Sequence, residues 1–183
     1  ARLESHLGAF RAELARSRAA ALMAEGDALA ALASIAALLT TYLPQREPHG
    51  ALYAATMQLI DMLGVAPDWP EAYVGWEALL LAELGFALDL SRCAVSGEED
   101  DLAYVSPRTG RAVGAAAAAP FSGRLLVLPA FLGGAPSNEA GRGVPAGMRL
   151  TGHFIAGWIA PAFGGAVPAA RARLQERLER RGA

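Results

Sequence analysis

The most reactive side chain of this 183-residue chain belongs to Cys93, its single cysteine. A cysteine nucleophile needs a neighbouring base and a positive environment that stabilises the thiolate. His153 is a candidate base and Arg92 adjoins the cysteine, but no spacing motif links the three residues. The residue types therefore favour a structural thiol over a catalytic one.

A turn follows Cys93 and leads to a hairpin, as in the first knuckle of a zinc ribbon. Structural zinc takes four ligands, usually in C-x-x-C pairs, whereas Ser96 stands three positions after Cys93 and the chain has no second cysteine. We therefore predict no metal and no cofactor, with the thiol of Cys93 as a small buried apolar group.

Other catalytic signatures are weak. The acidic run at 98–101 is typical of a solvated turn rather than of general acid–base catalysis. The sequence contains no phosphate-binding loop, no nucleophile elbow and no H-E-x-x-H helix. We therefore do not expect an enzyme.

Positive charge is concentrated toward the end of the chain. The net charge is +2 over residues 1–18, −11 over residues 19–105 and +7 over residues 106–183, and all 16 basic residues are arginine. Four arginines in a predicted hairpin and in the last helix are candidate DNA contacts: Arg108, Arg111, Arg171 and Arg173. A solvated helix face and an ordinary polar turn have the same composition, so both interpretations stay open.

Hydrophobic periodicity predicts a mainly α protein, a helical bundle with a small β-hairpin insert. Helices are expected at about 27–43, 52–64, 68–86, 148–159 and 168–181, with Asp27 and Asp68 as N-caps. The third helix is apolar on nearly every side, which predicts a central position. Polar and apolar residues alternate along 1–16, which predicts a strand. A hairpin is expected at 102–113, and 125–132 is expected to return to the helical layer. The predicted divisions are 1–16, 17–87, 88–124 and 125–183.

Two stretches, 28–45 and 150–170, contain no charged residue. The first is rich in alanine and ends at Pro44, and the second is interrupted by Pro161 and Pro168, which leave backbone groups that lipid cannot satisfy. We therefore predict a cytoplasmic protein that makes no contact with a membrane.

Five segments together carry a family resemblance: 1–8 (ARLESHLG), 42–49 (YLPQREPH), 83–90 (ELGFALDL) with Cys93, 104–113 (YVSPRTGRAV) and 150–154 (LTGHF). They resemble the DNA repair and recombination mediators of the RecO family, of alphaproteobacterial type, and the match runs in order over essentially the whole chain. The segment ELGFALDL before the cysteine is the most specific of the five.

The resemblance implies an N-terminal OB-fold barrel followed by a helical domain with a zinc-ribbon-like insert. Segment 1–16 would be the last strand of that barrel, most of which is missing from this sequence, and the zinc ligands of the insert are lost apart from Cys93, which would be the vestige of a zinc knuckle. The implied role is non-enzymatic and belongs to homologous recombination in the bacterial cytoplasm, at the nucleoid. It comprises binding of single- and double-stranded DNA, annealing of complementary strands, and binding of RecR and of the C-terminal tail of single-stranded DNA-binding protein to promote RecA loading.

A short acidic tail with an apolar end needs an apolar pocket beside a cation. The row Leu150, Phe154 and Trp158 at helical spacing is a candidate pocket, with Arg149 or His153 near the terminal carboxylate. The same spacing is typical of a helix that faces a core. A helical scaffold or adaptor without nucleic-acid contact is the alternative from another functional class.

Overall fold

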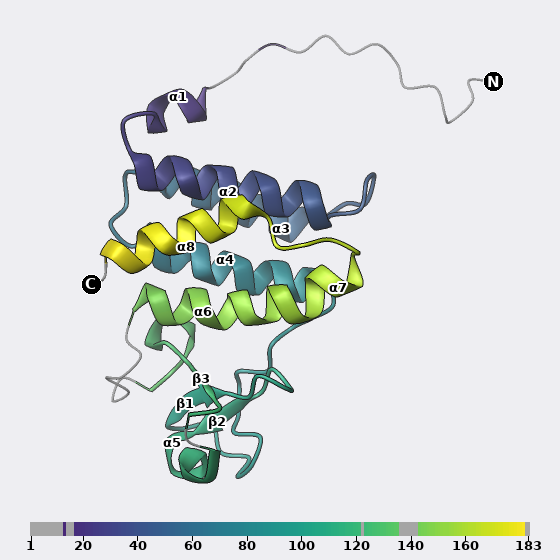
Figure 1. Cartoon of the computed structure of the whole chain (residues 1–183), viewed down its shortest axis with the longest axis vertical. Coiled ribbons are helices and arrows are strands. Elements are labelled where there is room, and N and C mark those ends of the chain that lie inside the picture. Colours follow the sequence, from purple (N-terminus) through teal and green to yellow (C-terminus); the bar gives the residue numbers. More distant parts are fainter. Residues whose placement is uncertain (1–12, 14–16, 122, 136–142, 182–183) are drawn as a thin grey trace, which may run out of the picture.

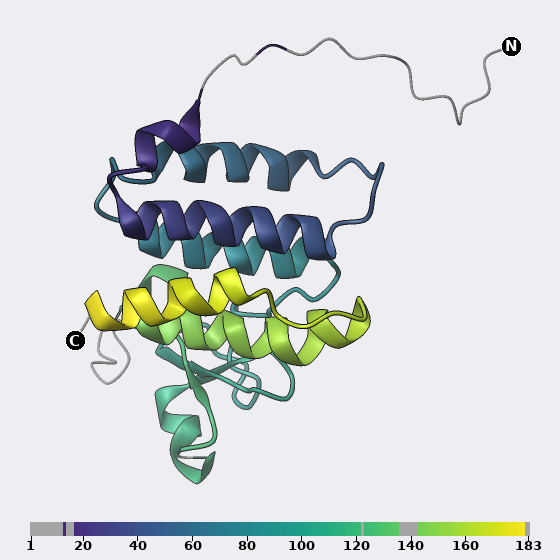
Figure 2. The same cartoon turned by 45° about the horizontal axis from the view of Figure 1, so that its top comes forward.

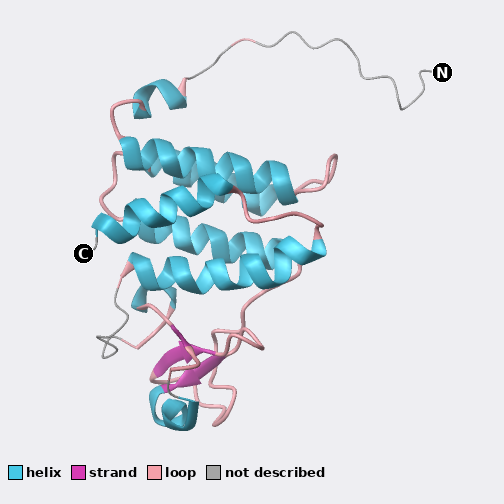
Figure 3. Ribbon diagram, viewed as in Figure 1, coloured by secondary structure: helices cyan, strands magenta, loops and turns pink. Residues whose placement is uncertain are grey.

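The protein is a stack of helices with a small sheet appended to one side (Figure 1; Figure 3). The computed structural model describes residues 13, 17–121, 123–135 and 143–181. The predicted fold class, a mainly α bundle with a β insert, is confirmed. The predicted OB-fold strand at 1–16 lies outside the described residues, apart from position 13.

Five longer α-helices form the stack, and three short α-helices also lie within the described residues. The longer ones are α2 (Gly26–Tyr42), α3 (Gly50–Met62), α4 (Trp69–Glu83), α6 (Val144–Phe154) and α8 (Ala169–Arg181). The short ones are α1 (Arg18–Leu22), α5 (Ala115–Ala118) and α7 (Ala160–Ala162). Helix α2 packs against α8, α8 against α6, α6 against α4 and α4 against α3, so α4 and α6 join the outer helices of the stack (Figure 2).

Helix α4 is the central helix, as predicted. Tyr73, Val74, Leu80 and Leu81 have no exposed surface. Full burial of a large apolar side chain contributes about 1.5–3 kcal/mol, so this helix supplies much of the stability of the bundle. Glu77 is the exception within it, a carboxylate that is also completely buried.

The two predicted N-caps differ in outcome. Asp68 directly precedes α4, which has Pro70 in its first turn, although the aspartate side chain makes no capping hydrogen bond. The prediction for Asp27 is wrong, because α2 begins one residue earlier and Asp27 lies inside its first turn. There its carboxylate accepts a hydrogen bond of 2.7 Å from Nε of Arg177 on α8, so it ties two helices together instead of capping one.

Helix α6 continues into a π-helical turn, Ile155–Ile159, before α7. The N–H of Ala160 donates to the carbonyl of Ile155, five residues back. Pro161 has no N–H to offer the carbonyl of Gly157, which favours a widened turn at this place. The helix predicted at 148–159 in fact begins at Val144, after Gly143 in a left-handed conformation (φ 105°) and with Pro145 in the first turn.

The insert holds an antiparallel sheet in which β1 (Leu102–Val105) lies between β2 (Ala112–Gly114) and β3 (Leu126–Val127). The hairpin is confirmed, and 125–132 packs against the helical layer as predicted, with β3 on α6 and Ala130–Leu132 on α4, although it also extends the sheet. Strand β3 pairs with β1 beyond the predicted boundary at 124, and a 3-10 turn, Ala130–Leu132, follows it. A two-stranded hairpin is marginally stable by itself, and the third strand covers its open edge.

The sheet shares one core with the helices. Val105, Ala112 and Leu128 are buried in the same apolar cluster as the helical residues, and α6 packs against β3. Among the described residues, no helix is both long and apolar enough to cross a membrane.

Candidate functional site

Three of the predicted site residues, Arg108, His153 and Trp158, come together where the hairpin turn rests on the end of α6 and the π-helical turn after it. A ring nitrogen of His153, Nε2, lies 3.0 Å from the carbonyl oxygen of Pro107. The ring of Trp158 packs on Gly110, whose φ of +67° is left-handed; a Cβ at this position would lie 2.6 Å from the indole ring. The turn that carries Arg108 is therefore held by a hydrogen bond and by close packing, and Arg108 itself is exposed at the turn.

Aromatic rings form the base of this joint. The ring centroid of Trp158 lies 4.4 Å from that of Phe154 and 6.3 Å from that of Phe86, and His153 meets Phe154 edge-on at 5.1 Å. Contacts of this kind contribute about 0.5–1.5 kcal/mol per pair beyond burial. The joint is therefore a rigid support for the hairpin turn.

The prediction that Leu150 and Phe154 line an open pocket is wrong. Both side chains are completely buried, because α6 lies against α4, α8 and β3. The remaining members of the predicted pocket reach the surface: Arg149 and His153 are exposed and Trp158 is half-buried. Arg149 pairs with Glu179 of α8 at 3.5 Å.

The four predicted DNA contacts fall into three groups. Arg108 and Arg173 are exposed and have no ion-pair partner in the described part of the chain. Arg111 donates from Nε to Asp89 at 3.2 Å. Hydrogen bonds from Ser91, reinforced by Arg111, hold the pKa of Asp89 below its ordinary value, so Arg111 faces a permanent negative charge.

The prediction that Arg171 faces phosphate is wrong. Its side chain is 4% exposed and is bound to Glu77, which is 0% exposed, by two hydrogen bonds of 3.0 Å from Nε and Nη2. Nη2 also donates to the carbonyl of Met148 at 2.6 Å. Burial by itself lowers the pKa of this guanidinium, but the charge and hydrogen bonds of Glu77 raise it above its ordinary value. Arg171 is a structural cation, not a surface one.

Sequence reasoning missed Glu77, the acceptor at the centre of this network. The hydroxyl of Tyr73 donates to it at 2.9 Å, the hydroxyl of Thr151 also donates to it, and Tyr73 is in turn bound to Ser34 at 2.7 Å. Burial, reinforced by the charge of Glu77, raises the pKa of Tyr73 well above its ordinary value. The available signal was the position of Glu77 in the middle of the apolar stretch 72–82, away from Glu71 and Glu83 at the helix ends, because a buried charge requires a partner.

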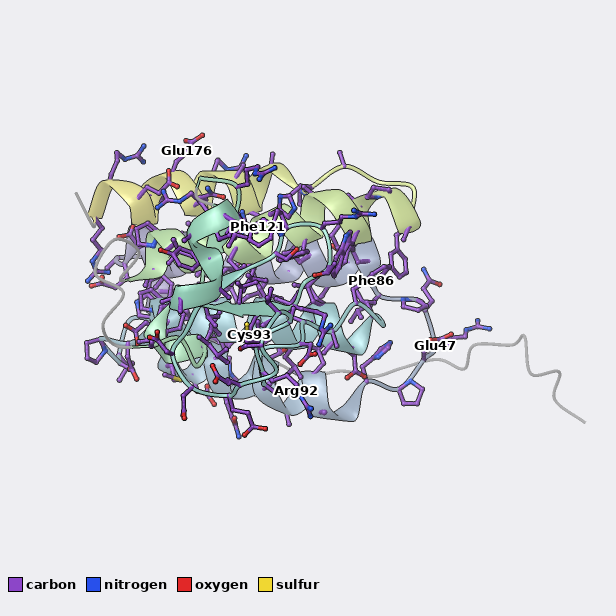
Figure 4. All side chains as sticks on the ribbon, turned by 90° about the horizontal axis from the view of Figure 1, so that it is seen from below. Glu47, Phe86, Arg92, Cys93, Phe121 and Glu176 are labelled. Carbon is purple, nitrogen blue, oxygen red and sulfur yellow. The ribbon has the colours of Figure 1, made fainter. Side chains whose placement is uncertain are left out.

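Cys93 does not fit a zinc site. Zinc ribbons need four ligands, but the chain has one cysteine. In the described residues, no group of three His, Cys, Asp or Glu side chains lies close enough to hold a metal ion. The thiol is buried within the insert (Figure 4), and His153, its proposed base, is bound to Pro107 instead.

Several hollows open on the described helical part, among them two with a largely apolar lining at helix ends. One, of about 240 Å³, lies between the end of α2 and α3 and is lined by Leu39, Leu43, Pro44, Glu47, His49, Leu52, Tyr53 and Thr56. The other, of about 290 Å³, lies between the starts of α4 and α6 and the end of α8, and is lined by Pro67, Pro70, Gly143, Val144, Pro145, Leu178 and Arg181. The second combines an apolar lining with the guanidinium of Arg181, which is 59% exposed and lies 4.0 Å from Asp27, a carboxylate that Arg177 approaches to 2.7 Å.

Comparison with known proteins gives a consistent result. The family model described as recombination protein O C terminal matches residues 23–162. The DNA repair protein RecO of Jannaschia sp. (strain CCS1) is 50% identical over 182 residues, which cover 98% of this chain and 73% of the relative. RecO of Paracoccus denitrificans (strain Pd 1222) is 50% identical over 97% of this chain and 72% of its own length. RecO of Rhodospirillum rubrum is 50% identical over 98% and 74%.

Proposed function

The chain belongs to the RecO family of DNA repair proteins, and from this premise we propose that it acts as a non-enzymatic mediator of homologous recombination. In this role it binds single- and double-stranded DNA and anneals complementary strands. It also binds RecR and the C-terminal tail of single-stranded DNA-binding protein, and so promotes the loading of RecA.

The observation that best supports DNA contact is the presentation of Arg108. Its guanidinium is exposed on a turn that His153 and Trp158 hold in place. Because the backbone of the turn is already held in place, phosphate binding has to order only the side chain of Arg108. Arg173 offers a second exposed cation on α8. Contacts of this kind are independent of base sequence and weaken as salt rises.

DNA binding is tested by fluorescence anisotropy with a labelled single strand over a series of salt concentrations. The double variant Arg108→Gln/Arg173→Gln is compared with the chain itself and with Arg46→Gln, an exposed arginine in the acidic first half. Each lost phosphate contact lowers the slope of log affinity against log salt by about 0.7 on single-stranded DNA. If the slope of log affinity against log salt is unchanged in the double variant, Arg108 and Arg173 do not contact phosphate. If the parent chain shows no salt-dependent binding, this result supports the alternative, a scaffold without nucleic-acid contact.

For the partner's tail, we propose the hollow beside Arg181 in place of the buried row on α6. Its proline, valine and leucine side chains suit an apolar end group, and Arg181 suits a terminal carboxylate. Binding of a fluorescent tail peptide is measured for Arg181→Gln and for Arg149→Gln. A selective loss in Arg181→Gln supports the hollow, whereas a selective loss in Arg149→Gln assigns the carboxylate to the exposed side of α6.

A further inference from the structure

We infer that the insert of this protein keeps its fold without a metal ion, because peptide N–H groups around the sulfur of Cys93 replace the bonds that a metal would make. The zinc-ribbon-like insert of the family implies a zinc site, and the donor set of this chain does not fit one.

The sulfur is enclosed by backbone donors. The N–H groups of Val95 and Ser96 point to Sγ at 3.4 Å each, and the N–H of Gly114 points to it at 3.3 Å from the end of β2. The side chain of Cys93 is only 1% exposed. Buried polar groups need partners of this kind, and here one sulfur atom satisfies three donors from two separate segments.

The two segments also hold each other without the sulfur. The N–H of Cys93 donates to Glu98 at 2.7 Å, and the N–H of Ala94 donates to Ala112 of β2 at 2.8 Å. Gly97 has a left-handed φ of +81°, and its N–H donates a hydrogen bond of 2.9 Å to the carbonyl of Cys93. The loop is therefore closed by its own backbone and attached to the sheet by direct hydrogen bonds.

The positions where further ligands would stand carry no suitable side chain. Gly114 faces the sulfur, and a Cβ built there would lie 3.8 Å from it. The hydroxyl of Ser96 is directed to the carboxylate of Glu98 at 3.4 Å. His49 and His153 each place one ring nitrogen against Glu83 and Pro107, and among the described residues no group of three His, Cys, Asp or Glu side chains is close enough to hold a metal ion.

The test is the metal content and chelator response of the chain as purified from zinc-supplemented cells. Elemental analysis is expected to find less than about 0.1 zinc per chain, and a strong chelator is expected to shift the melting temperature by less than about 1 °C, because metal-dependent folds unfold when the metal is removed. Stoichiometric zinc, or a chelator-induced loss of several degrees, overturns the inference.

A pair of variants tests the sulfur itself. Serine keeps a hydrogen-bond acceptor at this position and alanine does not, so Cys93→Ala is expected to lower the melting temperature more than Cys93→Ser. Equal melting temperatures for the chain and Cys93→Ala would show that the three N–H groups do not depend on the sulfur, and this result also overturns the inference. The zinc measurement on the unmodified chain decides the matter even if a variant does not fold.

Discussion

Replacing Arg171 with methionine is expected to destabilise the protein strongly while leaving its surface almost unchanged. The substitution removes both 3.0 Å hydrogen bonds to Glu77 and leaves the carboxylate fully buried, with only the hydroxyls of Tyr73 and Thr151 as donors. Breaking a buried ion pair from one side costs about 3–5 kcal/mol. The whole free energy of unfolding of a domain is about 5–15 kcal/mol, so the loss is a large fraction of the total.

The expected effect is a fall in melting temperature of about 10 °C, from about 2–4 °C per kcal/mol for a chain of this size. Urea unfolding followed by circular dichroism gives the free energy, and the midpoint should fall while the slope stays constant. Arg173→Met is the matched control, two positions along the same helix but exposed, and should change the free energy of unfolding by less than about 0.5 kcal/mol.

The double variant Glu77→Leu/Arg171→Met distinguishes two causes of the instability of Arg171→Met: an unpaired carboxylate at Glu77 and the loss of packing at position 171. An apolar pair in place of an ion pair is often neutral or stabilising, so the double variant should recover most of the stability that Arg171→Met loses. A cost of less than about 1 kcal/mol for Arg171→Met, or a double variant as unstable as the two single losses combined, would show that Glu77 does not depend on the guanidinium.

Three further outcomes are expected. Gly110→Ala should cost about 1–3 kcal/mol more in urea unfolding than Gly164→Ala, since both positions are left-handed but only Gly110 faces the Trp158 ring; equal losses would show that the ring moves aside freely. Burial opposes ionisation of Cys93, but the N–H groups of Gly114, Ser96 and Val95 lower the pKa of its thiol from 9.0 to about 7. The folded state therefore gains stability as pH rises from 7 to 9 and loses it as pH falls through 7, a dependence that should be absent from melting curves of Cys93→Ala; the same slope in both proteins would contradict it. Thr56→Val should cost about 1–3 kcal/mol in urea unfolding because it leaves the buried indole N–H of Trp76 without its 2.8 Å partner, and Thr56→Ser should cost much less; equal losses in the two variants would count against the hydrogen bond.

The spacing of apolar residues along the chain is sufficient to predict most of the helices of this protein. The apolar spacing along 69–83 predicts a central helix because such a helix is stable only when neighbours cover every side. The hairpin around Gly110 likewise follows from residue types and spacing alone. These features depend on contacts between near neighbours in the chain, so they can be recognised without the fold.

Which of the predicted DNA-contact and pocket residues face solvent depends on the tertiary structure. Arg171 has the composition of a surface arginine, but it is buried because Glu77, 94 positions earlier, meets it across the packed helices. Leu150 and Phe154 belong to the core for the same reason, since α4, α8 and β3 cover α6. Strand β3 is only two residues long, too short for a periodic signal, and it forms because β1 offers an open edge. Periodicity shows that a helix has an apolar face but not which elements cover it, and that depends on pairings between distant segments that only the folded chain brings together.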